Sequence, residues 1–282
     1  MNDDQNDSAS PGEQGWPVGR PSNRISDIST EYSQIINVLS EPLPLPRSSD
    51  GTQLGKQILA ARQQQLAERQ RFIERYQKAV MAFLKTKMGD AQASEAVWDL
   101  FVEKCMAGKL GGYDPSRSFR TYLKTVLRNT CYEYLRKKPQ SMAKLDSMAD
   151  AIPDTNDSEA DEAFDRTLVQ SLFNAALSAV RTIDVLQYVC LKLNAEALSA
   201  GVSPPSTNEL AKVLSLESGR TISRDNAKQI KSRASKQFSK QLIDEVAKLI
   251  CSDDLGEVEA TLGEMGILKY CKNALQKRRA ES

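Results

Sequence analysis

The longest uninterrupted helical pattern in the chain limits its fold more than any other feature. Residues 57–88 contain neither glycine nor proline, and apolar residues recur among them at helical spacing. These apolar positions are Leu66, Ile73, Val80, Phe83 and Leu84. Such a helix must bury its apolar face against other elements, and no segment of the chain alternates polar and apolar residues as a strand does. The sequence therefore predicts an all-α fold.

Further helical patterns follow the first one. They span approximately residues 93–108, 116–138, 165–194, 207–214 and 224–250, with two short helices in 251–282. Glycine or proline follows several of them, as is typical of helix ends. Ser206 or Thr207 is suited to cap the helix at 207–214, and Ser223 the long helix after it, with a loop over 215–223.

The charge distribution divides this helical chain into two domains. Residues 57–138 form the first predicted helical domain and residues 166–250 the second. Between them, residues 139–165 hold eight acidic residues and one lysine, a net charge of −7 that predicts an extended acidic linker. Residues 1–56 are predicted to be disordered or extended. Residues 251–282 form a helical extension that is a packed cap, a regulator-binding element or a simple addition.

Several functional classes lack support in the sequence. The chain has no histidine, and its five cysteines stand far apart, which removes the usual zinc-site spacings and histidine-based catalysis. It also lacks a phosphate-cradling glycine loop and a paired nucleophile and base. The start is acidic rather than signal-like, and no stretch approaches the roughly 20 apolar residues of a membrane span. We expect a cytoplasmic protein that is not an enzyme and has no metal, cofactor, catalytic residue or membrane partner, with buried structural thiols.

The first of two strongly basic helices lies at residues 116–138. It has seven basic residues and one acidic residue, a net charge of +6. Polar and cationic residues are expected to cluster opposite its apolar face: Arg117, Thr121, Lys124, Thr125, Arg128, Asn129, Tyr132 and Arg136. Interleaved cations, amides and aromatic rings suit binding to the phosphates and bases of a nucleic acid. The alternative is a solvated basic face that the acidic linker balances.

The second basic segment spans residues 220–240, also with seven basic residues, one acidic residue and a net charge of +6. Small or apolar residues are expected on the inner face of its helix, namely Ala227, Ile230, Ala234 and Phe238. The opposite face carries Arg224, Lys228, Gln229 and Ser232. This pattern favours a helix-turn-helix motif whose second helix enters the major groove. A basic helix in a purely structural bundle would look similar.

Three segments carry a resemblance to a known family. The strongest is YDPSRSFRTYLKTVLRNTCYEYLRKK at 113–138, which resembles the extracytoplasmic-function (ECF) group of bacterial sigma-70 factors. Upstream, FIERYQKAVMAFLKTKMGDAQASEAVWDLFVEKCM resembles the two preceding helices of that domain. Downstream, NELAKVL and ISRDNAKQIKSRASKQF resemble the carboxy-terminal helix-turn-helix. The resemblance covers about residues 65–138 and 168–248.

The resemblance implies a promoter-specificity subunit with core RNA polymerase and promoter DNA as partners. An anti-sigma factor is a further partner that it leaves open. The residues implied in melting the minus-10 element are Tyr113, Phe119, Tyr122, Lys124, Arg128, Asn129, Tyr132 and Arg136. Those implied at the minus-35 element are Arg224, Asp225, Lys228, Gln229, Lys231, Ser232, Arg233 and Lys236. Those implied in binding polymerase are Glu95, Trp98, Asp99 and Glu103.

Two departures from the family pattern bear on these assignments. Trp98 stands where the family usually has glutamine, so it is either part of the polymerase contact or a core residue. The predicted loop at 215–223 is longer than the family's turn, which leaves the base-reading positions open by a few residues. The alternative function is a free-standing helix-turn-helix regulator that binds DNA without polymerase.

Overall fold

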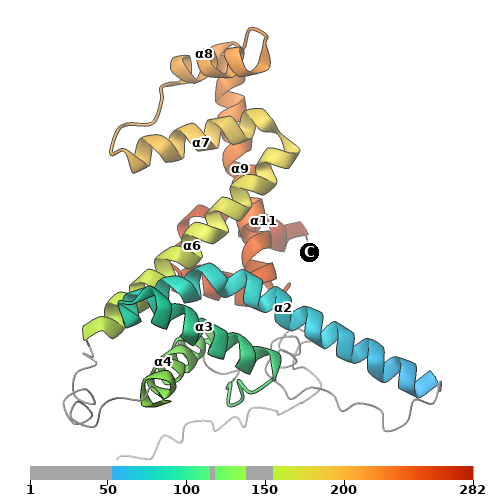
Figure 1. Cartoon of the computed structure of the whole chain (residues 1–282). Coiled ribbons are helices and arrows are strands. Elements are labelled where there is room, and N and C mark those ends of the chain that lie inside the picture. The colour runs from blue at the N-terminus through green and yellow to red at the C-terminus, as the bar shows by residue number, and fades with distance from the viewer. Residues whose placement is uncertain (1–52, 115–117, 138–154, 282) are drawn as a thin grey trace, which may run out of the picture.

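The computed structural model describes residues 53–114, 118–137 and 155–281, and every regular element in these ranges is a helix (Figure 1). The helices are α2 (Gln53–Met88), α3 (Ala91–Met106), α4 (Phe119–Lys137), α6 (Thr155–Ile183), α7 (Val185–Ser199), α8 (Thr207–Ser218), α9 (Arg224–Ile250), α10 (Leu255–Glu264), the 3₁₀ turn η3 (Leu268–Tyr270) and α11 (Lys272–Glu281). The predicted all-α fold is confirmed. Of the segment 1–56 that was predicted to be disordered or extended, residues 1–52 lie outside the described residues, as do Arg117, Lys138 and linker residues 139–154. Residues 53–56 are the first turn of α2, so the prediction is wrong for them.

A large hydrophobic core, the base core, lies around α2. This helix crosses the base of the molecule, with α3 and α4 on one side and α6 and the end of α9 on the other (Figure 1). Each of these helices contributes side chains that are fully buried, including Phe83, Phe101, Leu127, Phe164 and Val246. Burial of each such side chain stabilises the fold by about 1.5–3 kcal/mol. The long amphipathic pattern of α2 is thus satisfied by helices from distant parts of the sequence.

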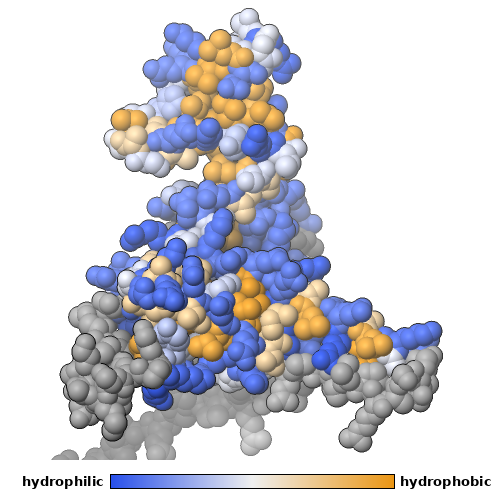
Figure 2. Space-filling view, in the orientation of Figure 1, coloured by the Kyte–Doolittle hydropathy of each residue, from blue (hydrophilic) through white to orange (hydrophobic). Residues whose placement is uncertain are grey.

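A second, smaller core, the upper core, joins α7, α8 and the first turns of α9. Its buried members are Cys190, Leu210, Ala211, Leu214, Ile222, Ala227 and Ala234. Figure 2 shows apolar side chains on the surface at this end of the molecule, and Leu198 and Leu216, exposed 68% and 83%, belong to α7 and α8. Helix α9 belongs to both cores, since its first turns pack in the upper core and its last turns in the base core.

The caps predicted for α8 and α9 are present. Ser206 forms a reciprocal capping box with Glu209, and the Ser223 hydroxyl accepts a hydrogen bond from the Asn226 amide at 3.2 Å. The predicted loop over 215–223 is wrong, because α8 continues to Ser218 and ends at Gly219 with φ of 66°. The turn between the two helices is therefore only residues 219–223, much closer to a short turn than the sequence indicated.

The predicted helix over 165–194 and the extended linker before it also differ from the structure. Helix α6 begins at Thr155, so residues 155–165 are helical and the prediction of an extended linker is wrong for them. The helix then stops at Ile183, because Asp184 adopts an extended backbone and caps α7. The Asp184 carboxylate accepts hydrogen bonds from the Leu186 amide at 2.9 Å and from the Gln187 amide at 3.1 Å.

The carboxy-terminal residues are part of the base core. Their buried side chains, all at most 5% exposed, are Val258, Leu262, Ile267, Cys271 and Leu275. Of the roles considered for residues 251–282, the packed cap is the one the structure supports. The packing also departs from the predicted division at 138, 166 and 250, because α6, the end of α9 and this cap share one core with α2, α3 and α4.

All five cysteines are free thiols, and only Cys251 is not buried. Burial raises the pKa of the Cys105, Cys131 and Cys271 thiols to about 12 each, and it raises the pKa of Cys190 as well. The four buried thiols are therefore protonated at neutral pH and pack as small apolar groups, as predicted.

Candidate nucleic-acid interface

The basic helix α4 does not present all of its cations to solvent. Lys124 is only 8% exposed, and Arg128 is half-buried. The prediction that Lys124 lies on an open face opposite the apolar one is wrong. Its ammonium lies 2.7 Å from the Asp165 carboxylate, and the Arg128 guanidinium lies 2.6 Å from that of Asp161.

Three aspartates of α6 make these contacts, and we name them the carboxylate row: Asp157, Asp161 and Asp165. They follow one another at four-residue intervals and therefore share one face of the helix. Asp157 pairs with Lys87 of α2 and with the Arg128 Nε at 3.2 Å. Asp161 also lies 3.9 Å from Lys124. Each aspartate of the row therefore has two cations within 4.0 Å.

The pairing order shows that α4 and α6 are antiparallel at this contact. As the residue numbers rise along α6, the partners fall along α4, from Arg128 through Lys124 to Arg120, whose Nε lies 3.9 Å from Asp165. Both rows advance about one helical turn per step, so their charges stay in register. The sequence contained this signal in the matching four-residue spacing of the two rows. The pattern was missed because the acids were assigned to an extended linker.

A cluster of five aromatic rings lies at the start of α4. Phe119 contacts the rings of Phe72, Tyr76, Tyr113 and Tyr122 at centroid distances of 5.3–5.9 Å. The Tyr122 hydroxyl donates hydrogen bonds to the backbone carbonyls of Leu110 and Gly111. Burial raises the pKa of Tyr122 to about 12, which keeps this donor protonated. Three predicted residues, Tyr113, Phe119 and Tyr122, are thus brought together, half-buried and held by neighbours.

The rest of α4 keeps an exposed polar face. Thr121, Thr125, Asn129 and Arg136 are exposed, and Tyr132 is half-buried with the Lys87 ammonium 5.8 Å from its ring centre. Toward the carboxyl end, Lys104 and Lys137 both pair with Glu133, which lowers the pKa of that carboxyl to about 2. The open part of α4 is therefore a polar strip flanked by paired charges.

Helix α9 carries the second predicted set in a more open form. Seven of the eight residues are exposed: Arg224, Asp225, Lys228, Gln229, Ser232, Arg233 and Lys236. Lys231 is half-buried. None of the five cations among the eight pairs with a carboxylate in the described part of the chain. The inner face has the predicted composition, since Ala227 and Ala234 are fully buried. The two predicted sets lie at opposite ends of the molecule, on α4 at the base and beside α8 at the top (Figure 1).

Helix α3 presents an acidic stripe on its outer face. Glu95, Asp99 and Glu103 are all exposed at four-residue spacing and have no ion-pair partner among the described residues. Trp98 lies beside them but is half-buried, with its ring 5.8 Å from that of Phe101 and packed against the base core. The helix that carries the stripe is capped at its start by Asp90, whose carboxylate accepts a hydrogen bond from the Ala93 amide at 2.9 Å.

The described residues hold neither a metal-binding cluster nor a membrane-spanning helix. Within the described ranges, no three side chains of the types that bind metals lie together. None of the helices described is both long and apolar enough to span a bilayer.

Comparison with known families assigns part of this chain. Residues 72–139 match the family model of sigma-70 region 2, a segment that begins in α2 and includes α3 and α4. Neither curated proteins nor solved structures give a match to the chain. The aromatic cluster, the acidic stripe and the basic helix α4 thus all lie in the segment that matches sigma-70 region 2, which we name the region 2 domain, whereas α6 to α11 lie outside it.

Proposed function

We propose that this protein is a sigma factor of the ECF group that binds core RNA polymerase and directs promoter recognition, DNA melting and transcription initiation. The match of residues 72–139 to sigma-70 region 2 carries the proposal, because that region implies both polymerase binding and promoter contact. The protein acts in the cytoplasm and adds specificity to polymerase without catalysing a reaction itself. Residues 1–56 and 251–282 are extensions of the minimal ECF plan.

The polar strip of α4 and the aromatic cluster receive the melted minus-10 element. Exposed Asn129 and Arg136 supply an amide and a cation, and half-buried Tyr132 supplies a ring edge next to them. An aromatic surface next to cations suits an unstacked base and its phosphate. Lys124 and Arg128 contribute less to this surface, because the carboxylate row already pairs with both of them.

The carboxylate row gives a prediction for this surface. Replacing both Asp161 and Asp165 by asparagine leaves Lys124 without a carboxylate within reach, and we expect the free energy of unfolding to fall by about 1–3 kcal/mol. Lys124 and Arg120 lose their carboxylate partners while Arg128 keeps Asp157, and this positive charge raises the affinity for single-stranded DNA and steepens its salt dependence by about one to two units of slope. Urea unfolding and fluorescence anisotropy at several salt concentrations measure the two effects.

The control for this variant is Glu162→Gln. Glu162 lies on the same helix but is exposed, and among the described residues it pairs only with Arg166, at 3.9 Å. The Glu162→Gln variant should change neither the free energy of unfolding nor the affinity for single-stranded DNA. Unchanged DNA affinity in the double variant, together with unchanged stability, would show that the carboxylate row does not compete with nucleic acid for α4.

The acidic stripe of α3 docks the protein on polymerase. Glu95, Asp99 and Glu103 are exposed and form no ion pair with another described residue, which suits a basic partner surface. The double charge reversal of Glu95 and Asp99 to lysine is expected to weaken binding to core polymerase about ten-fold or more. Binding of duplex DNA by the free protein should be unchanged or slightly stronger.

A matched charge reversal separates docking from overall charge. Glu159 and Glu217 are exposed on α6 and α8 and have no ion-pair partner among the described residues. Replacing both by lysine changes the net charge equally and should leave polymerase affinity within about two-fold of the unaltered protein. If both double variants lose affinity equally, the stripe is not the docking surface.

Helices α8 and α9 act as the helix-turn-helix that reads the minus-35 element. The five-residue turn, the capped start of α9 and its row of exposed cations, none of which pairs with a carboxylate of the described residues, support this role. The region lies beyond the matched segment, so the proposal rests here on the contacts and exposure of its own residues.

The central experiment is transcription in vitro with core RNA polymerase. The full-length protein should co-purify with core polymerase and direct it to defined start sites, whose sequences reveal the promoter. Binding to DNA without binding to polymerase would instead identify a free-standing helix-turn-helix regulator. An anti-sigma factor, if one exists, should compete with polymerase for the region 2 domain.

A further inference from the structure

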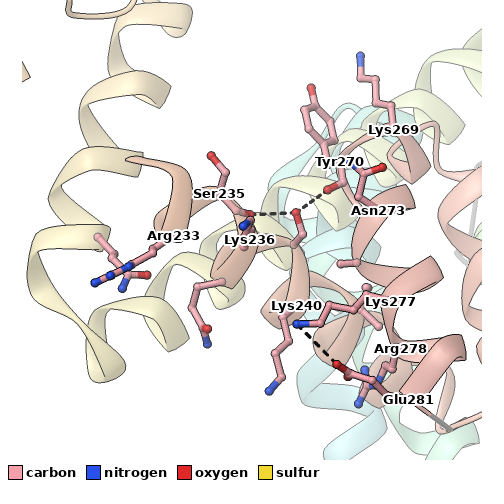
Figure 3. Close-up of a pocket in the computed structure, with 15 residues that line it drawn as sticks. Arg233, Ser235, Lys236, Lys240, Lys269, Tyr270, Asn273, Lys277, Arg278 and Glu281 are labelled. Atoms are coloured by element: carbon pink, nitrogen blue, oxygen red, sulfur yellow. Dashed lines mark hydrogen bonds and ion pairs between the residues drawn. The ribbon is translucent and has the colours of Figure 1, made fainter. Parts of the chain in front are cut away.

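A cleft of about 850 Å³ lies between the middle of α9 and the carboxy-terminal cap, outside the region 2 domain (Figure 3). Arg233, Lys236 and Lys240 line it from α9. Lys269 and Tyr270 of η3 and Lys277 of α11 line it from the opposite wall. The cleft therefore exists only because the cap folds back against α9.

The cleft has an excess of unpaired positive charge. Six cations and one carboxylate line it, and two of the cations are neutralised: Lys277 lies 3.5 Å from Glu281, and Arg278 lies 2.8 Å from Asp244. The remaining four, Arg233, Lys236, Lys240 and Lys269, have no carboxylate within 4.0 Å in the described part of the chain. All four are exposed. Four cations on the two walls without a carboxylate partner among the described residues indicate that the occupant is a polyanion.

The wall opposite α9 is held in place. Ile267, Cys271 and Leu275 anchor it in the base core. The Ser239 hydroxyl of α9 donates a hydrogen bond to the Tyr270 carbonyl at 2.6 Å, and the Tyr270 ring packs edge-on against Phe173 at 5.6 Å. The cations on the two walls are therefore presented at a fixed separation rather than on a loose tail.

The cleft continues the exposed row of α9. Arg233, Lys236 and Lys240 stand at intervals of three and four residues on one face of the helix, following Gln229 on that face. From Lys228 to Lys240 the helix rises by about 18 Å. This corresponds to about five base pairs at roughly 3.4 Å each.

We propose that this cleft binds the phosphate backbone of duplex DNA that flanks the element contacted by the first turns of α9. The proposal rests on the proposed function of α9 as a DNA-binding helix and adds a contact that the carboxy-terminal cap supplies. Lys240 and Lys269, one on each wall, hold phosphates, and the contact lengthens the footprint of the protein without reading bases.

The test uses the full-length protein and the double variant Lys240→Glu with Lys269→Glu. Both residues are exposed and neither forms an ion pair with another described residue; Lys269 contacts only the ring of neighbouring Tyr270, at 5.1 Å, so thermal unfolding should stay close to that of the unaltered protein. Affinity for a 40-base-pair duplex is measured by anisotropy across a salt series. We expect at least about ten-fold weaker binding and a salt slope smaller by about two, because two phosphate contacts are lost. The pair Lys240→Gln with Lys269→Gln repeats the test with a smaller change if the first variant unfolds.

A charge-matched control and a second variant make each outcome decisive. Lys78→Glu with Lys272→Glu changes the net charge equally on exposed residues outside the cleft, and it should keep at least half of the affinity and the full slope. Equal losses in control and cleft variants would overturn the proposal, as would a cleft variant that binds duplex normally. If the cleft variant loses only its binding to single-stranded RNA, the cleft is an RNA site and the proposal is overturned.

A separate variant, Arg224→Ala with Lys228→Ala, tests the first turns of α9. Normal duplex binding by that variant would contradict the proposed function.

Discussion

Replacing Arg224 and Lys228 together by alanine is expected to abolish promoter-specific transcription and to leave binding to core polymerase intact. Both side chains are exposed on the first two turns of α9, and neither has an ion-pair partner among the described residues. The backbone beneath them is held by the Ser223 cap and by buried Ala227. Truncation therefore removes contacts to DNA without disturbing the helix. At about 1–3 kcal/mol for each base contact, the double variant should lose most of its preference for the promoter.

Run-off transcription from a mapped promoter measures this loss, and co-purification measures polymerase binding. The control is Arg166→Ala with Lys192→Ala, which removes two cations from exposed intrahelical pairs on α6 and α7. Such pairs contribute little to stability, so the control should transcribe normally. Retained promoter use by the α9 variant would remove α9 from the base-reading role.

Replacing Leu262 by alanine should lower the free energy of unfolding by about 2–5 kcal/mol. Leu262 lies on α10 and is fully buried in the base core with residues of α2, α3 and α4. The substitution leaves a cavity in the same core that supports the region 2 domain. An independent carboxy-terminal extension would instead allow the region 2 domain to remain stable when this residue is changed.

Urea unfolding followed by circular dichroism gives the size of the effect. Leu216→Ala is the matched control, because this leucine lies on α8 with 83% of its surface exposed and should shift stability by less than about 0.5 kcal/mol. Removal of residues 252–282 should have a larger effect than Leu262→Ala, since it uncovers the apolar surface beneath the whole cap. A truncated protein with unaltered stability would contradict the shared core.

The elements with strong local signals were predictable. The long pattern before Met88, the cap at Ser223 and the small buried residues Ala227 and Ala234 lie where the sequence indicated. The loop predicted at 215–223 was too long at its start, because residues 215–218 are the last turn of α8. In the structure the Ser215 hydroxyl donates to the Ala211 carbonyl at 2.7 Å and accepts from the Ile222 amide at 2.8 Å, which lets the helix continue.

The acidic residues before Asp165 show why the candidate site could be predicted only in part. On composition they are a solvated run, and a run of acids with few apolar residues disfavours a packed helix. Their role depends on Lys87, Lys124 and Arg128, which belong to two other helices. Only when α6 lies against α4 do the opposite charges neutralise one another and make this helix favourable.

The sequence by itself determined most of the helices, the caps of α8 and α9, the two basic segments and the resemblance of 113–138 to a sigma factor, because these depend on local spacing and residue type. The tertiary structure decided which charges remain available to a partner. The carboxylate row pairs with cations of α4, whereas the carboxy-terminal cap places further cations opposite those of α9. Both arrangements arise from contacts between residues far apart in the chain. Such contacts depend on how the helices bury their apolar faces, which local spacing alone does not specify.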